Sequence, residues 1–284
     1  MDDSKLMKVL NREISKDLSN LEFKEILKER ILITGAKGSI GEALIKELGM
    51  YKGLKFLATD IEGDCEVLDV TDENSVIKIL NSFKPTMIVH LAGAKHAPEG
   101  EIDYWATFNI NTVGTYNFIK NISSNIKMIL TSTCKSANPE IVYGASKLIA
   151  ERMVLNSGGS VARFFNVIES SGNVFTIWQK VQLDHPLEVA PACERYFITI
   201  DEAIGLLKFT MMNEPGRYVV NNVKLRNMGD IVRDLYPNRD IKEIKPRRGD
   251  RLTEKFIASS ESVESLYLND SIAKIVSIHD YREV

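Results

Sequence analysis

The sequence contains little cysteine, little histidine and no long apolar run. Its three cysteines, Cys65, Cys134 and Cys193, have no Cys-x-x-Cys spacing, and there are four histidines in 284 residues. This pattern offers no disulfide framework or metal-site signature and is typical of a reducing cytosol. No apolar stretch approaches the roughly 20 residues of a membrane span, and the polar start lacks a signal-peptide core. We therefore expect a soluble, cytoplasmic protein with no metal ion and no membrane partner.

A strong excess of charge is also absent. The net charge is −3 at pH 7, so nothing global indicates a nucleic-acid partner. One local excess lies in residues 217–255, where eleven lysines and arginines stand against six acidic residues. This segment is either a small lobe that binds an anion or an ordinary solvated surface.

Short apolar runs and helix-like patterns alternate along the chain up to about residue 166. Strands are expected at 31–34, 55–60, 87–92, 127–133 and 161–166, and helices at 40–48, 75–83, 105–121 and 143–156. This alternation predicts an α/β fold, a Rossmann-type doubly wound parallel sheet with a small C-terminal substrate-binding lobe.

A glycine-rich turn follows the first expected strand. Gly35 allows a tight turn, Gly38 lets the backbone approach a pyrophosphate, and Gly41 permits close contact between helix and strand. Ser39 and Ile40 open the next helix, whose N-terminus offers free N–H groups and a positive dipole end to phosphates. The turn therefore predicts a dinucleotide site.

Acidic residues after the turn bear on the choice of dinucleotide. Asp60 closes the second strand, where its carboxylate is placed for the adenosine ribose and repels a 2′-phosphate, which favours NAD. Lys37 could neutralise such a phosphate, so NADP stays open. Asp69 and Val70 follow a polar loop, where they meet the adenine edge or Asp69 forms a turn or helix cap.

Tyr143 and Lys147 form a Tyr-x-x-x-Lys pair about a hundred residues further on. They stand one helical turn apart, and the ammonium should favour phenolate and lower the tyrosine pKa from its ordinary value of about 10. Thr133 ends the preceding strand, so it lies near the Tyr143 hydroxyl or satisfies the backbone there. Asn111 orients a proton-relay water, or it caps or packs its helix.

Seven segments resemble, in order, the signatures of one family: 30–41, 90–98, 132–139, 143–147, 163–167, 195–199 and 247–254. They are similar to the extended short-chain dehydrogenases that act on nucleotide-sugars. The most similar subgroup is the UDP-N-acetylglucosamine 4,6-dehydratases of polysaccharide biosynthesis, and the lead-in at 11–18 resembles its longer members.

The resemblance implies a role for each matching residue. Tyr143 would take the proton of the sugar 4-hydroxyl, and Lys147 would bind the nicotinamide ribose. Other assignments follow: Leu91, Ala92 and Gly93 at the cofactor; Lys95 and His96 at the sugar; Asn166 and Arg247 at the nucleotide diphosphate; Arg195 and Glu254 near the nucleotide end; Asn173 and Val174 in a loop closing over it. A UDP-sugar substrate and a homo-oligomer, paired through helices 105–121 and 143–156, are also implied.

The expected domains are then three. Residues 1–29 form a helical extension whose apolar stripe packs on the main domain or binds a separate partner. Residues 30–165 form the dinucleotide-binding domain, to which 196–213 return. Residues 166–195 and 214–284 form the nucleotide-sugar-binding lobe.

One residue departs from the family pattern. The dehydratases have Ser-Thr-Asp-Lys at the strand end, where the Asp protonates the departing 6-hydroxyl and the Lys is the base at C5. Here Lys135 is kept, but Cys134 replaces the Asp. A thiol is protonated at neutral pH and can serve as the acid. Lys135 could instead make it a thiolate base or nucleophile, or Cys134 is a small buried residue in an enzyme that needs no acid.

The leading hypothesis is an NAD(P)-dependent nucleotide-sugar 4,6-dehydratase, with or without inversion at C5. It would oxidise C4, eliminate water across C5 and C6 and return the hydride to C6. A 4-epimerase or 4-ketoreductase on the same scaffold is the first alternative. A non-catalytic sensor of NAD or a nucleotide-sugar is the second.

Overall fold

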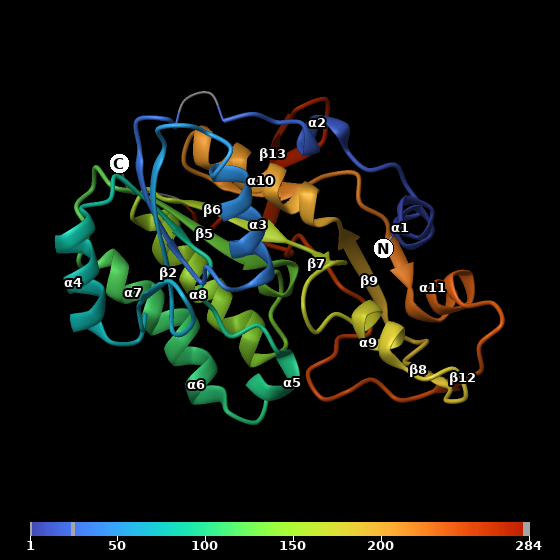
Figure 1. The fold of residues 1–284 in the computed structure, drawn as a ribbon. Helices are drawn as coiled ribbons and strands as arrows, with labels where there is room; N and C mark the ends of the chain where they lie inside the picture. The colour runs from blue at the N-terminus through green and yellow to red at the C-terminus, as the bar shows by residue number, and fades with distance from the viewer. Residues whose placement is uncertain (1, 24–25, 281–284) are drawn as a thin grey trace.

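A nine-stranded sheet lies at the centre of the part of the chain that the computed structural model describes, residues 2–23 and 26–280 (Figure 1). Its strands run in the order β13-β14-β10-β6-β5-β4-β1-β2-β3. Their bounds are β1 Arg30–Thr34, β2 Lys55–Asp60, β3 Glu66–Val67, β4 Met87–His90, β5 Lys127–Thr133, β6 Ser160–Phe164, β10 Arg217–Val220, β13 Glu261–Tyr267 and β14 Ile272–Ser277.

The strands from β3 to β10 pair in parallel, and the β13–β14 hairpin adds an antiparallel edge. Chain order reverses between β1 and β4, which lie side by side although β2 and β3 follow β1 in the sequence. This reversal is the switch point at which doubly wound sheets bind ligands. The predicted fold class is confirmed.

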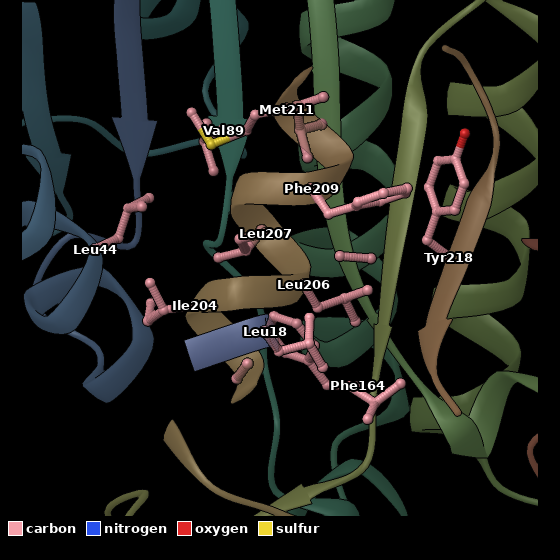
Figure 2. Packing of buried hydrophobic residues seen from close by; sticks show 14 of the residues in the cluster. Leu18, Leu44, Val89, Phe164, Ile204, Leu206, Leu207, Phe209, Met211 and Tyr218 are labelled. Atoms are coloured by element: carbon pink, nitrogen blue, oxygen red, sulfur yellow. The ribbon is translucent and has the colours of Figure 1, made fainter. Parts of the chain in front are cut away.

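Helices cover both faces of the sheet (Figure 1). One face carries α3 (Ser39–Leu48) and α10 (Ile200–Met212), and the other carries α4 (Glu73–Phe83), α7 (Gly114–Ile119) and α8 (Val142–Asn156). Side chains along β1 alternate between the two layers: Ile31 and Ile33 enter the α10 layer shown in Figure 2, whereas Leu32 enters the other. Both sides of the strand are therefore buried, which explains its uninterrupted apolar run.

The helix expected at 105–121 runs without a break over residues 104–119, but it is not α-helical throughout. It consists of α6 (Tyr104–Phe108), a π-helical turn at Asn109–Val113 and α7. Such turns insert an extra residue into an α-helix and occur often at functional sites. Here the turn carries Asn111.

A second lobe is built from small sheets and helices. Its strands are β7 Asn166–Val167, β9 Glu194–Ile198, β11 Leu225–Asn227, β8 Leu187–Val189 and β12 Ile241–Glu243, and its helices are α9 Val174–Lys180 and α11 Met228–Leu235. The N-terminal helix α1 (Asp3–Leu10) packs its apolar stripe on this lobe rather than on the main domain, in one cluster with α9 and α11. The short elements α2 (Lys16–Ser19) and α5 (Ala97–Gly100) complete the described helices, together with a 3-10 turn at Cys134–Ser136.

The large sheet also contains β10, β13 and β14, which belong to the segment 214–284 that the sequence assigned to the lobe. Because β10 pairs with β6, these strands belong to the main sheet, and the assignment of the whole segment to the lobe is wrong. Strand partners far along the chain leave no local pattern, so this boundary was not visible from composition. No helix among the described residues is both long enough and apolar enough to span a bilayer.

Candidate active site

A cavity of about 630 Å³ opens at the carboxyl ends of β1, β4 and β5. It brings together most of the residues that the sequence singled out. Those that line it are Gly35, Lys37, Gly38, Ser39, Ile40, Gly41, Asp60, Asp69, Val70, Leu91, Ala92, Gly93, Lys95, His96, Thr133, Lys135, Tyr143, Lys147 and Asn166. Seven other predicted site residues, all in the described part of the chain, do not line the cavity: Cys134, Asn111, Asn173, Val174, Arg195, Arg247 and Glu254.

The glycine turn has the geometry of a phosphate cradle. Gly35 has a φ of +70°, and a Cβ there would lie 2.6 Å from the Ala92 nitrogen. A Cβ at Gly41 would lie 2.6 Å from the Ala36 oxygen, so both positions require glycine. The nearest atom to a Cβ at Gly38 is 3.4 Å away, which leaves that side open to a ligand at the start of α3.

Asp60 braces the turn from the end of β2. Its carboxylate accepts hydrogen bonds from the backbone N–H of Lys37 at 2.8 Å and of Ile61 at 2.7 Å. The Lys37 ammonium pairs with Asp64. Asp69 accepts from the Thr71 N–H and hydroxyl at 2.8 and 2.7 Å, so it forms a turn as well as lining the cavity.

Lys147 and Asn111 meet at the turn after β4. A Cβ on Gly93 would lie 2.9 Å from Asn111 Oδ1 and 3.2 Å from Lys147 Nζ. Asn111 accepts from Ala94 N–H at 2.9 Å and donates to Ala94 O and to Ser146 Oγ, both at 3.0 Å. These bonds give Asn111 a packing role that holds the turn against α8. Burial lowers the pKa of Lys147 to about 8, with Glu151 acting in the opposite direction.

The pKa of Tyr143 is raised rather than lowered in the cofactor-free protein. Removal from water raises it, whereas the charge of Lys135 and the Thr133 hydroxyl lower it. The predicted direction is therefore wrong for this state, and the cation that opposes the shift is Lys135. Thr133 and Tyr143 both line the cavity, and the Thr133 hydroxyl is within hydrogen-bonding reach of the Tyr143 side chain.

Lys135 is held in a buried ion pair. Its Nζ lies 2.7 Å from Glu254 Oε1 and 3.1 Å from Asn166 Oδ1. Burial alone lowers the pKa of Lys135, but the Glu254 charge outweighs it and raises the pKa. Glu254, whose side chain is fully buried, also accepts from Asn166 Nδ2 at 2.7 Å. Arg195 Nε is 3.6 Å from Glu254 Oε1, so Glu254 lies between the cations of Lys135 and Arg195.

Cys134 is fully buried and belongs to the same apolar cluster as the side chains of the α10 layer, with Thr133, Lys135 and Glu254 as its polar neighbours. Burial, followed by the charge of Glu254, raises the pKa of its thiol to about 12. The thiolate is therefore strongly disfavoured. This contradicts the alternative in which Cys134 is a thiolate base or nucleophile. The protonated thiol has no place in the cavity lining.

The loop 170–174 reaches across the cavity to the glycine turn. Ser171 N–H donates to Ser39 Oγ at 2.9 Å, and Lys95 Nζ donates to Ser171 Oγ at 2.9 Å. His96 lies against Gly172, where a Cβ would be 3.2 Å from its ring. Asn173 caps α9 and donates to Val167 O, and Val174 begins that helix. Arg247 is largely exposed and pairs with Asp250 at 3.2 Å.

Sequence reasoning missed two groups of residues. Phe164 and Phe165 line the cavity at the end of β6, a position that follows the same strand-end rule as Thr133. Glu151 lies one helical turn after Lys147 and is fully buried beside Arg163 and Arg217. The sequence signal for Glu151 is a charged residue four positions after Lys147 on an otherwise apolar face of the helix.

The model of the family described as polysaccharide biosynthesis protein matches residues 54–275. The chain belongs to this family. A UDP-N-acetylglucosamine 4,6-dehydratase (inverting) of Campylobacter jejuni is 27% identical over 83% of this chain and 79% of its own length. The capsular polysaccharide biosynthesis protein CapD of Staphylococcus aureus is 29% identical over 65% of this chain. Membership of the extended short-chain dehydrogenases is thereby confirmed.

Solved structures share the fold of the family. The UDP-glucose 4-epimerase of Thermus thermophilus, in complex with NAD, has a TM-score of 0.70 at 18% identity over 80% of this chain and 89% of that one. WbmG of Bordetella bronchiseptica, in complex with NAD and UDP, has a TM-score of 0.66 at 19% identity over 80% and 84%. The chain spans about a third of the length of CapD and of Bacillus subtilis EpsC, at 36% and 35%.

Proposed function

We propose that this chain is an NAD(P)-dependent nucleotide-sugar 4,6-dehydratase acting on a UDP-N-acetylglucosamine-like substrate. The observation that carries the proposal is the presence of Lys135 beside Tyr143 and Thr133 in one cavity. The first two steps of such a reaction are an alcohol oxidation and a proton transfer at C5. Side chains suited to both steps then lie within one site. The similarity to the Campylobacter dehydratase over most of both chains supports it.

The residues of the cavity fit a nicotinamide dinucleotide. The open side of Gly38 and the start of α3 suit its pyrophosphate, and Asp60 suits the ribose. When bound, the dinucleotide accepts the hydride from C4 and later returns it to C6. NAD is preferred in this proposal because Asp60 disfavours a 2′-phosphate and because the Lys37 ammonium is already paired with Asp64.

The side chains would act in sequence. Tyr143 takes the proton of the 4-hydroxyl, with Thr133 as its hydrogen-bonding neighbour, while the Lys147 ammonium stabilises the developing phenolate. The C4 ketone acidifies the hydrogen at C5, and Lys135 lies where it can remove that proton. Lys95, His96 and Asn166 line the remaining wall, where sugar and diphosphate would lie.

The test is to incubate the purified chain with UDP-N-acetylglucosamine and NAD and to measure the product mass. Loss of one water supports dehydration. An unchanged mass with an inverted C4 signal by NMR indicates a 4-epimerase instead. Bound NAD without turnover of any UDP-, dTDP- or GDP-sugar indicates the sensor.

The 4-epimerase or 4-ketoreductase is the second candidate because of one observation. Cys134, at the position of the dehydratase acid, is buried in the core. An enzyme that only oxidises and reduces C4 needs Tyr143 and Lys147 but no acid for the 6-hydroxyl.

We also propose a homo-oligomer that pairs through α6, α7 and α8. Four large apolar side chains on these helices are exposed: Tyr104 and Trp105 on α6, Tyr116 on α7 and Ile149 on α8. Light scattering of the wild type and of a Trp105→Glu variant tests the pairing, and an unchanged mass in the variant contradicts it.

A further inference from the structure

Dehydration needs a base at C5 and an acid for the departing 6-hydroxyl. Lys135 lines the cavity, whereas the Cys134 thiol does not. Directly behind Lys135 lies Glu254, a carboxylate brought there from a segment 119 residues away. On the basis of the proposed function, we propose that Glu254 stores a proton for Lys135, so that this one lysine acts as both base and acid.

The hydrogen bonds around Lys135 fit this role. An ammonium has three N–H donors. Two of them point to Glu254 Oε1 at 2.7 Å and Asn166 Oδ1 at 3.1 Å, which leaves the third for the cavity that the side chain lines. A proton can therefore move along the short bond to Glu254 while another N–H position faces the substrate.

Glu254 contacts the cavity through Lys135 and Asn166, which both line it, and its other neighbours include the buried Cys134 thiol. Its side chain is fully buried, and its Oε2 accepts from Asn166 Nδ2 at 2.7 Å and from the Tyr196 N–H at 3.2 Å. It does not line the cavity, so it is a positioning and proton-holding residue rather than a catalytic one. The titratable residues near Lys135 or Glu254 are Cys134, Tyr143, Tyr196 and Arg195.

The resting state is an ion pair. Burial raises the pKa of Glu254, but the charges of Lys135 and Arg195 outweigh it and lower the pKa. The reaction then begins when the ammonium passes one proton to Glu254, which gives a neutral amine and a neutral carboxyl. The amine removes the C5 proton, and the C5–H electron pair enters the C4 ketone as an enolate.

The ammonium that results donates a proton to the 6-oxygen while the C6–O bond breaks and the C5–C6 double bond forms. Water leaves, and Lys135 is again neutral. Glu254 returns its stored proton and restores the ion pair. The substrate has lost one hydrogen and one hydroxyl as water. When hydride returns to C6, the restored Lys135 ammonium gives a proton to C5, and release of the proton held by Tyr143 allows Lys135 to be reprotonated. No oxidant or reductant beyond the dinucleotide is needed. Under this scheme no acid is required at position 134.

The test compares Glu254→Gln, Glu254→Asp and Glu194→Gln in the full chain with NAD and UDP-N-acetylglucosamine. Glu194 provides a matched control, because it lies on β9 beside the segment that carries Glu254, but its carboxylate accepts from the Thr253 hydroxyl at the surface. We expect Glu254→Gln to slow water loss by about a hundredfold, the lower end of general acid–base catalysis, while reduced nicotinamide still forms. Glu254→Asp recovers part of the rate, and Glu194→Gln leaves it unchanged.

The pH profile separates proton storage from a structural role. Without the carboxylate, Lys135 must lose its proton to solvent, so water loss by Glu254→Gln should rise with pH more steeply than that of the wild type. The cofactor-free variant should also show faster labelling of Lys135 by an amine-specific reagent at neutral pH. Equal losses in the Gln and Asp variants with an unchanged pH profile would overturn the proposal.

Cys134→Ala gives an independent decision between the two acids. Retained water loss supports Lys135, whereas selective loss of water release with normal nicotinamide reduction makes Cys134 the donor and overturns the proposal. A wild type that reacts but releases no water refutes the proposed function itself. A dehydrating wild type with a fully active Glu254→Gln variant refutes only the role of Glu254.

Discussion

Replacing Glu151 by Gln should destabilise the fold strongly, because Glu151 is the centre of a fully buried charge network. Its carboxylate accepts from Arg163 Nη2 at 2.7 Å, from Arg217 Nε at 2.9 Å and from Ser136 Oγ at 2.6 Å. Removing one partner of a buried ion pair costs about 3–5 kcal/mol. Each arginine keeps a second carboxylate, Glu261 for Arg163 and Asp280 for Arg217, so we expect the lower end, about 3 kcal/mol.

For a chain of this size, such a loss lowers the melting temperature by roughly 6–12 °C. Thermal unfolding followed by circular dichroism measures it. The control is Glu73→Gln, which removes an ion pair of similar length, 2.6 Å to Lys120, at the solvent-exposed surface. Surface pairs contribute little, so the control should melt with the wild type. A Glu151→Gln variant that also melts with the wild type would refute the reasoning.

The pH dependence of the same comparison sharpens the test. Burial raises the pKa of Glu151, but the charges of Arg163 and Arg217 outweigh it and lower the pKa to about 2. A carboxyl with a depressed pKa stabilises the fold above its unfolded pKa of about 4.3 and loses that contribution as the pH falls toward 2. The stability difference between wild type and variant should therefore shrink over this range. A constant difference would mean that the charge of Glu151 is not what stabilises the fold.

Three further predictions concern the cavity. Gly93→Ala places a Cβ 2.9 Å from Asn111 Oδ1 and 3.2 Å from Lys147 Nζ, so it should weaken NAD binding about tenfold or more by fluorescence titration, and unchanged affinity would contradict the packing described. Lys147, with a pKa of about 8 against an ordinary 10.5, penalises the cofactor-free fold below pH 8, because the unfolded chain binds more protons between these values. The stability of the wild type relative to Lys147→Met should rise by roughly 3 kcal/mol over that range in urea titrations, and a flat difference would exclude a depressed pKa. Ser171→Ala removes the hydroxyl that accepts from Lys95, so bound NAD should exchange faster than in the exposed-site control Ser123→Ala, and equal exchange rates would show that the loop does not retain it.

The main sheet was predictable because each of its central strands is buried on both faces. The strand at Lys127–Thr133 was found at its predicted bounds, since its apolar run is bounded by a polar loop and a strand-end cluster. The predicted helix 105–121 is present, but its π turn at Asn109–Val113 was not predicted, because a π turn keeps the composition of an α-helix and changes only its hydrogen bonding. The hairpin of β13 and β14 was missed, and its place in the main sheet depends on the pairing of β14 with β10, which leaves no local signal.

The same reasoning explains which part of the site was predictable. The glycine turn, Asp60 and the Tyr143–Lys147 pair all line the cavity. Each was predictable because its residues lie within one short segment, where their spacing can be recognised. The partner of Lys135 does not: Glu254 is 119 residues away and reaches it only through the fold of the second lobe.

This distance changes what the substitution at Cys134 implies. A motif compares residues position by position, and by that comparison the chain has lost a carboxylate next to Lys135. The proposed scheme requires instead that a carboxylate lie within hydrogen-bonding distance of the lysine, and Glu254 Oε1 does so at 2.7 Å. Under the proposed scheme, the proton of the buried Glu254 would reach a substrate through Lys135, which lines the cavity. If the proposal holds, the replacement of Asp by Cys does not by itself argue against dehydration.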